Sequence, residues 1–222
     1  MKLVLALWDA DHQQLLGEDL RITLRQAGAT RLQLNLDDDH IPDEVLRLEH
    51  FDEPLTSVVS VWADRPVDVV AALRPYAARI AGWQVEERQP LVPPDVADGA
   101  RLDGLAQVAF LRKPAELEYA DWQTHWQGPH TQVAMDTQAT FGYVQNRVTD
   151  RLTDDTPAVD AIVEELFPAE AMHDIHAYYG SNGDNNELDR RLMLLMESVA
   201  RMGADHDLDV VATSHYAWDL SG

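Results

Sequence analysis

The sequence predicts an α+β protein in which two βαββαβ halves follow one another in a single chain. Short apolar runs of strand length alternate with amphipathic helical stretches. A segment rich in proline and acidic residues, 91–103, interrupts them near the middle and has the composition of a linker. The same order of elements returns after it. The 222 residues therefore divide into a first half, 1–90, and a second half, 104–222.

The first half contains four strand-like runs and two helical stretches. The strands are expected at 3–8, 31–37, 57–62 and 82–88, and the helices at 15–27 and 66–80. Gly28 stands where a glycine commonly ends a helix, and Pro66 stands in a first helical turn, where proline is tolerated. Leu32, Leu34 and Leu36 alternate with polar residues, which is typical of a strand that buries one face.

The second half repeats this order and adds one helix. Its strands are expected at 105–111, 141–148, 159–167 and 208–216, and its helices at 115–135, 168–179 and 188–202. The last helix carries an apolar stripe with methionines beside it, and Gly180–Asn186 before it is rich in turn-forming residues. We expect this segment to gate a cavity, and the helix to form part of the cavity wall or of the interface between halves; the alternative is a helix that only packs beneath an ordinary surface loop.

Each half thus has the order of a ferredoxin-like unit, whose helices cover only one face of an antiparallel sheet. The other face must also be buried, either by packing two sheets face to face or by closing them into a barrel. The prediction is therefore two tandem ferredoxin-like units that form an intramolecular α+β barrel, a pseudo-dimer within one chain.

Charge and composition exclude several classes of partner. The chain has 39 acidic and 17 basic residues, a formal charge of −22, which argues against nucleic acid and against an anionic membrane surface. No apolar run approaches the roughly 20 residues of a membrane span. Asp9 and Asp11 follow the apolar start, which we interpret as a strand and not as a signal peptide, so a cytoplasmic location is expected. A neutral or apolar small molecule is the expected ligand, and a homodimer remains open.

Several segments of the second half resemble the EthD family in the correct order. The sequence Phe-Leu-Arg-Lys-Pro at 110–114 is followed by a helix with Trp122, Trp126 and His130, and then by strand-like segments at 142–148, 159–164 and 210–218. The first half matches only in element order. The resemblance implies a dimeric α+β barrel fold and a role in the breakdown or tailoring of aromatic, ether or polyketide-like compounds. It implies no single reaction.

Trp122, Trp126 and His130 are spaced by four residues, so they fall within about 80° of one another on a helix. Two tryptophans beside an imidazole could form a pocket wall with a proton-transfer group. Alternatively, the tryptophans pack on the sheet and His130 hydrogen-bonds to a backbone carbonyl. Gly128 and Pro129 can kink or restart the helix, so the sequence leaves open whether His130 stays on this face.

Strand alternation places Asp160 and Glu164 on the face expected to line the barrel cavity. Burial there would raise the pKa of a carboxyl group toward the range of a general base. The alternative is a hydrogen-bonded structural carboxylate or a position at the rim. On the preceding strand, Tyr143 and Asn146 lie on opposite faces. Tyr143 is the better family match and a candidate catalytic group, or else a core tyrosine, and Asn146 is a candidate substrate ligand.

No metal or cofactor site is expected. Cysteine is absent, and no glycine-rich phosphate loop occurs. His173 and His176 lie one helical turn apart but lack an evident third ligand. His215, near Ser214 and Asp219, suggests no catalytic triad, because no nucleophile elbow surrounds the serine.

Three functions are compatible with these observations. The first is a cofactor-independent acid–base enzyme that acts on an aromatic, polyketide-like or xenobiotic compound. The second is a non-catalytic protein that carries the substrate of an oxygenase. The third is haem-linked oxidation, which rests on fold analogy alone.

Overall fold

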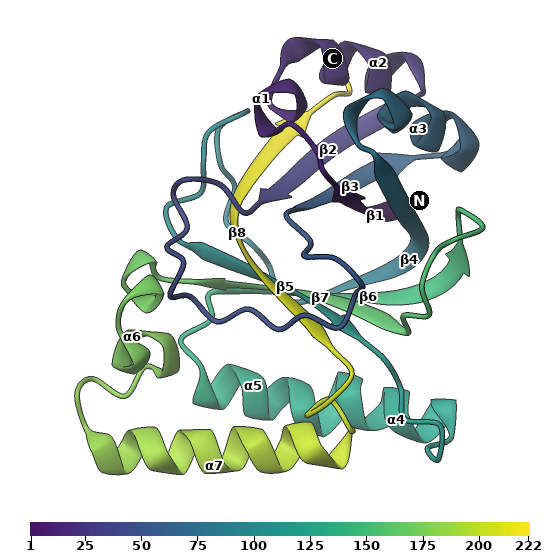
Figure 1. The fold of residues 1–222 in the computed structure, drawn as a ribbon. Helices are drawn as coiled ribbons and strands as arrows, with labels where there is room; N and C mark the ends of the chain where they lie inside the picture. The colour runs from purple at the N-terminus through teal and green to yellow at the C-terminus, as the bar shows by residue number, and fades with distance from the viewer.

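Eight antiparallel strands close into one barrel, with helices on two opposite sides of it (Figure 1). The computed structural model describes residues 1–222. Around the barrel, the strands follow the order β1-β3-β2-β8-β5-β7-β6-β4. Their bounds are Lys2–Trp8 (β1), Ala29–Leu36 (β2), Ser57–Ala63 (β3), Arg79–Leu91 (β4), Leu105–Leu111 (β5), Gly142–Arg151 (β6), Ala161–Phe167 (β7) and Asp209–Asp219 (β8).

The helices form two separate layers. One layer, at the top of Figure 1, consists of α1 (His12–Leu15), α2 (Glu18–Gln26) and α3 (Pro66–Leu73). The other lies at the opposite side and consists of α4 (Tyr119–His125), α5 (Thr131–Thr137), α6 (Ile175–Tyr179) and α7 (Asn185–Arg201). A π-helical turn, Trp126–His130, joins α4 to α5, and a 3-10 turn, Ala169–Met172, precedes α6. None of these helices is both long and apolar enough to cross a membrane.

The two halves have the same strand order. The first half reads β4-β1-β3-β2 and the second reads β8-β5-β7-β6, each the order of a ferredoxin-like unit. The halves join at two seams, where β2 pairs with β8 and β4 pairs with β6. Every strand therefore has two hydrogen-bonded neighbours. The predicted fold class, two ferredoxin-like units that close an intramolecular α+β barrel, is confirmed.

The predicted helix bounds differ from the structure where proline or glycine interrupts them. The helix expected at 15–27 is divided at Gly17, which is the N-cap of α2. The helix expected at 66–80 ends at Leu73, because Pro75 follows in a short 3-10 turn and β4 already begins at Arg79. By contrast, Pro129 does not break the long helix. The chain accommodates it in the π-helical turn and stays helical through Thr137.

Side chains that point into the barrel form an apolar layer and a polar layer. The apolar layer includes Trp8, Trp83 and Phe110, and Phe51 from the long 37–56 loop packs against it. The polar layer contains Gln33, Asn35, Asn146, Glu164 and His215, all buried. Outward-pointing side chains pack under the two helical layers in separate apolar clusters. Closure of the barrel thus buries polar groups from both halves together.

Candidate functional site

The predicted site residues lie on both faces of β7 and its neighbours. Ile162 packs with the apolar layer inside the barrel, so Glu164, two residues on, shares the inner face. Ala161 and Val163 pack with Trp122 and Trp126 beneath the helices. A sheet one strand thick therefore separates Glu164 from the predicted tryptophan and histidine wall. The two groups cannot form one site.

Glu164 accepts hydrogen bonds from side chains of three other residues. Asn35 Nδ2 and His215 Nδ1 lie 2.9 and 2.8 Å from Oε1, and Gln33 Nε2 lies 2.8 Å from Oε2. Glu164 and His215 are each only 4% exposed. An ionised carboxylate can only accept hydrogen bonds, so Nδ1 of His215 carries the proton in this pair. The arrangement fixes the orientation of the imidazole ring and leaves Nε2 as its second reactive atom.

His215 lines a cavity of about 480 Å³ at the mouth of the barrel, which we call the mouth cavity. Nε2 of His215 has no hydrogen-bond partner among the protein atoms. Side chains from β2, β3, β4 and β8 and from the segment after β4 surround this space: Arg31, Trp62, Gln89, Pro93, Trp218 and Asp219. That segment is held against β8, since the backbone N–H of Gly99 donates to the carbonyl of Ala217 at 2.9 Å. The imidazole thus lies at the boundary between a buried carboxylate and a cavity.

A buried ion pair, Lys2 with Glu87, lies close to this group. Lys2 Nζ is 2.9 Å from Oε1 of Glu87, and Lys2 is only 4% exposed. The indole of Trp62 donates to Oε2 of Glu87 at 3.3 Å. Asn146 also points inward and donates to the carbonyl of Ile162 at 3.1 Å, while its Oδ1 has no partner. Asn146, and not Tyr143, is therefore the inward-facing residue of the two.

The electrostatics of Glu164 differ from the expectation. Burial alone would raise the pKa of this carboxyl, but the charge and hydrogen bond of His215, the charge of Lys2 and the hydrogen bond of Asn35 outweigh burial and lower the pKa to about 2. A carboxylate this acidic is a poor general base at neutral pH. The expected raised pKa at Glu164 is wrong, because His215 on β8, together with Lys2 and Asn35 from the first half, stabilises the ionised form by more than burial destabilises it.

Asp160 does not join this group. It precedes β7, and its Oδ2 accepts a hydrogen bond of 2.8 Å from the backbone N–H of Lys113 at the end of β5. The contact matches the structural alternative considered for this carboxylate.

The tryptophans and His130 lie under the helices on the outer face of the sheet. Trp122 and Trp126 stack with ring centroids 5.3 Å apart, and the indole of Trp122 donates to the carbonyl of Met202 at 3.1 Å. His130 is buried, with Nδ1 3.0 Å from Oγ of Ser198. Burial and, to a lesser degree, His125 lower the pKa of His130 to about 4, so it is neutral at pH 7. The chain stays helical through Pro129 by way of the π-helical turn, and the tryptophans lie in the apolar core.

Tyr143 lies on the same outer face. Burial, with a further contribution from Glu165, raises the pKa of Tyr143 well above its ordinary value, and Gln145 donates to its hydroxyl at 3.3 Å. Glu165, the register partner of Tyr143 on β7, also lies on this face. Its Oε1 is buried without a partner, and burial raises its pKa to about 7.

Two functional candidates were missed from the sequence. His215 was considered only as part of a triad. The alternation of Val211, Thr213 and His215 along one face of β8 would have placed it inside the barrel. Glu165 carries no comparable sequence signal, because a single acidic residue at a strand position usually faces solvent.

The segment expected to act as a gate and the pair His173 and His176 have other environments. Gly180–Asn186 does not line the mouth cavity. The helix after it, α7, packs on α5 and on the π-helical turn of its own half, and thus forms no interface between halves. Nδ1 of His176 lies 2.7 Å from Oγ of Ser181. No three His, Asp or Glu side chains in the chain converge in a way that could hold a metal ion.

Comparisons with known proteins support the fold. No family model and no curated protein sequence matches the chain. Among solved structures, an anthrone oxidase-like protein is similar with a TM-score of 0.59 at 9% identity, over 100% of this chain and 93% of the other. A mutant chlorite dismutase from Candidatus Nitrospira defluvii gives 0.48 at 12% identity, over 99% and 92%. The likeness to the anthrone oxidase-like protein, over the whole of this chain, agrees with the fold described above.

Proposed function

We propose that this chain is a small-molecule enzyme of the acid–base type, in which His215 transfers a proton on a substrate bound in the mouth cavity. The observation that carries the proposal is His215 itself. Its Nδ1 is held by a buried carboxylate at 2.8 Å, while the ring lines a cavity of about 480 Å³. Glu164 is then a positioning residue and not the base assigned to it from the sequence.

In the proposed reaction, Nε2 of His215 takes a proton from a C–H or O–H group of the substrate. The imidazolium formed is stabilised by Glu164, which remains ionised because its pKa is about 2. Gln33 and Asn35 keep the carboxylate in place. The same Nε2 returns the proton to another atom of the substrate, so the step is an isomerisation that needs no further reactant.

The cavity wall favours a neutral substrate with an aromatic ring. Trp62 offers a flat apolar surface to the cavity. Asp95, Asp98 and Asp219 outnumber Arg31 in the lining, and the chain carries a formal charge of −22, so an anionic substrate is repelled. A volume of about 480 Å³ is within the usual range for small-molecule sites.

Membership of the EthD family belongs to the same proposal. It rests on the motifs of the second half, and the family's association with aromatic and polyketide-like compounds agrees with the cavity wall. An accessory protein that binds such a compound for an oxygenase would share this cavity but would not convert the compound. Haem-linked oxidation would require haem uptake, which a Soret band after reconstitution would reveal.

A neutral aromatic carbon acid, 5-nitrobenzisoxazole, provides the first test, because its ring opens once a base removes a proton. We expect His215→Ala to lower the rate of ring opening by about 100-fold or more. Glu164→Gln should lower kcat by about 10- to 100-fold with little change in KM, since it acts through the imidazole.

His130→Ala is the matched control, because this histidine is equally buried but lies on the outer face of the sheet. Its rate should equal that of the wild type. Equal rates for wild type and His215→Ala would refute His215 as the base. Binding of an aromatic ligand in the mouth cavity without any conversion would favour the accessory protein.

A further inference from the structure

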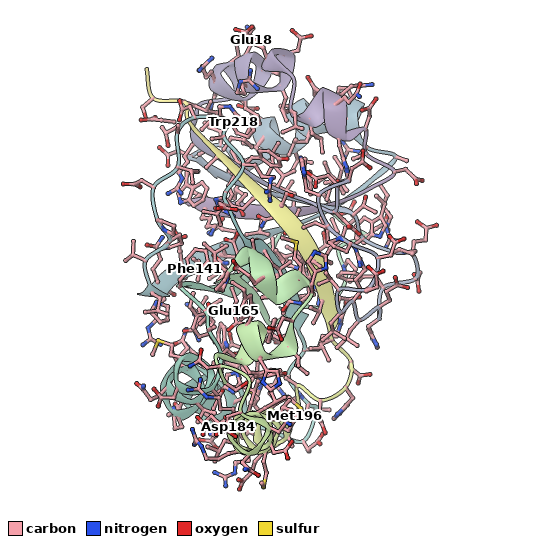
Figure 2. The ribbon with its side chains drawn as sticks, turned by 90° about the vertical axis from the view of Figure 1, so that its left-hand side faces the viewer. Glu18, Phe141, Glu165, Asp184, Met196 and Trp218 are labelled. Atoms are coloured by element: carbon pink, nitrogen blue, oxygen red, sulfur yellow. The ribbon has the colours of Figure 1, made fainter.

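A second cavity of about 530 Å³ lies outside the barrel, between the outer face of β5, helix α6 and the loop after β2. We call it the α6 cavity. Apolar side chains form most of its wall, among them Val45, Leu46, Met172, Ile175 and Tyr178. Figure 2 shows Glu165, on the neighbouring strand β7, beside the turns of α6. The sheet separates this cavity from His215, so the two cavities are distinct.

Gln107 is the polar side chain of β5 that lines the α6 cavity, and it is only 6% exposed. Its Oε1 accepts a hydrogen bond of 2.6 Å from the hydroxyl of Tyr178. Its Nε2 is buried and has no partner. A buried donor without an acceptor is unfavourable, and such groups are rare in folded proteins. The free N–H of Gln107 therefore marks the place where a ligand acceptor would be stabilised.

A side chain on the strand next to Gln107 also has a buried polar atom without a hydrogen-bond partner. Glu165 is the register partner of Gln107 across β5 and β7, and its Oε1 is also buried without a partner. Two neighbouring polar side chains thus have unused hydrogen-bonding atoms on this face of the sheet. By comparison, every carboxylate oxygen of Glu164 on the inner face is occupied.

The rim indicates the character of the ligand. Leu46 and Ile175 line the cavity and are 58% and 52% exposed, so apolar surface is presented at the rim. The charged side chains of the lining are Glu44 and Asp174, accompanied by His173, and no lysine or arginine is present. An apolar wall with an acidic rim favours a neutral, mainly apolar molecule and disfavours an anion.

We propose that the α6 cavity is a second ligand site, which binds a neutral, mainly apolar carbonyl compound whose oxygen accepts a hydrogen bond from Nε2 of Gln107. This inference is independent of the acid–base reaction in the mouth cavity. No chemical step is assigned to the site.

NMR titration with matched probes tests the proposal. Acetophenone supplies an aryl ketone, isopropylbenzene has nearly the same shape without the acceptor, and benzoate supplies an anion. We expect acetophenone to shift the side-chain amide signal of Gln107 and to bind about tenfold more tightly than isopropylbenzene. Benzoate should bind more weakly than either.

Gln107→Leu should reduce the affinity for acetophenone to that for isopropylbenzene. Ile175→Trp, which fills the cavity from an exposed rim position, should abolish binding of both and serves as a second variant if Gln107→Leu folds poorly. His215→Ala should leave binding unchanged.

Three outcomes would overturn the proposal: no shift of the Gln107 amide with acetophenone, equal affinity for acetophenone in wild type and Gln107→Leu, or loss of binding in His215→Ala. The last outcome would assign the ketone to the mouth cavity and would leave the acid–base proposal standing.

Discussion

Glu164 and Glu165 are consecutive residues of β7, yet their surroundings give their carboxyl groups opposite properties. Glu164 points into the barrel, has hydrogen bonds from Gln33, Asn35 and His215, and has a pKa of about 2. Glu165 points toward the helices, has an unpartnered oxygen, and has a pKa of about 7. Burial raises both values. The difference is that only Glu164 has partners that stabilise the ionised form.

The comparison explains why burial alone does not identify a general base. On the inner face, partners from both halves of the barrel stabilise an ionised carboxylate. This carboxylate in turn fixes the orientation of the His215 ring. On the outer face, the helices of one half cover a carboxyl group and provide no donor. Each prediction below concerns a substitution on one face of the sheet, and the unchanged other face is the reference.

The largest effect is expected from removal of the inner carboxylate. Glu164→Ala leaves Gln33, Asn35 and His215 without their common acceptor inside the barrel, so the free energy of unfolding should fall by about 3–5 kcal/mol. Urea denaturation monitored by tryptophan fluorescence measures this change. Glu170→Ala, at an exposed acidic residue, should change stability by no more than about 0.5 kcal/mol. Similar losses for both variants would contradict the role given to the inner network.

The inner face should also determine the response to acid. The pKa of Glu164 is about 2 in the fold and below its ordinary value of 4.5. Its ionised form therefore stabilises the protein above about pH 4.5, and this contribution of roughly 2–3 kcal/mol is lost as the pH falls toward 2. Unfolding free energies can be measured at about three pH values between 5 and 2.5. As the pH decreases, they should fall less steeply for Glu164→Gln than for wild type. Parallel curves for wild type and Glu164→Gln would show that the surroundings of Glu164 do not stabilise its ionised form.

The outer face should respond with the opposite sign. The pKa of Glu165 is about 7, above its ordinary value of 4.5, so folding favours the protonated form and stability falls as the pH rises from about 4.5 to 7. Glu165→Gln keeps the shape and removes this cost. It should stabilise the protein by about 1–3 kcal/mol near pH 8 and have little effect near pH 4.5, by thermal or urea denaturation. Destabilisation near pH 8 would mean that the ionised carboxylate has a partner.

The smallest effect is expected at the histidine of the outer face. Ser198→Ala removes the hydroxyl 3.0 Å from Nδ1 of His130 and should reduce stability by about 0.5–1.5 kcal/mol. The rate of 5-nitrobenzisoxazole opening should not change, because this hydrogen bond lies across the sheet from His215. A rate loss comparable to that of Glu164→Gln would mean that the outer face also contributes to the reaction.

The sequence was sufficient for the fold because strand alternation and helix periodicity are local. The strand expected at 105–111 has those bounds in the structure, and the inward direction of Glu164 followed from its place in β7. Helix ends were less accurate, since Pro75 ended one helix while Pro129 was absorbed into a π-helical turn. A proline at a predicted helical position therefore had two different outcomes in the two halves.

The site was predictable only in part, because its partners are distant in sequence. Glu164 is 131 residues from Gln33 and 129 from Asn35. These residues meet only when the seam between β2 and β8 is formed. No local pattern predicts that meeting. The sign of the pKa change at Glu164 depends on it, and so does the role of His215.

The covalent joining of the two halves has a consequence for symmetry. Ser57 and Ala161 begin β3 and β7 opposite Leu7 and Leu111, so Ser60 occupies in the first half the position that Glu164 occupies in the second. In a barrel built from two identical chains, any side chain at this position would occur twice, and two carboxylates would share one buried layer and repel each other. A chain that contains both halves can differ between them. It can therefore place a carboxylate at this position in one half and an uncharged hydroxyl group at the equivalent position in the other, and confine its reactive centre to one end of a nearly two-fold scaffold.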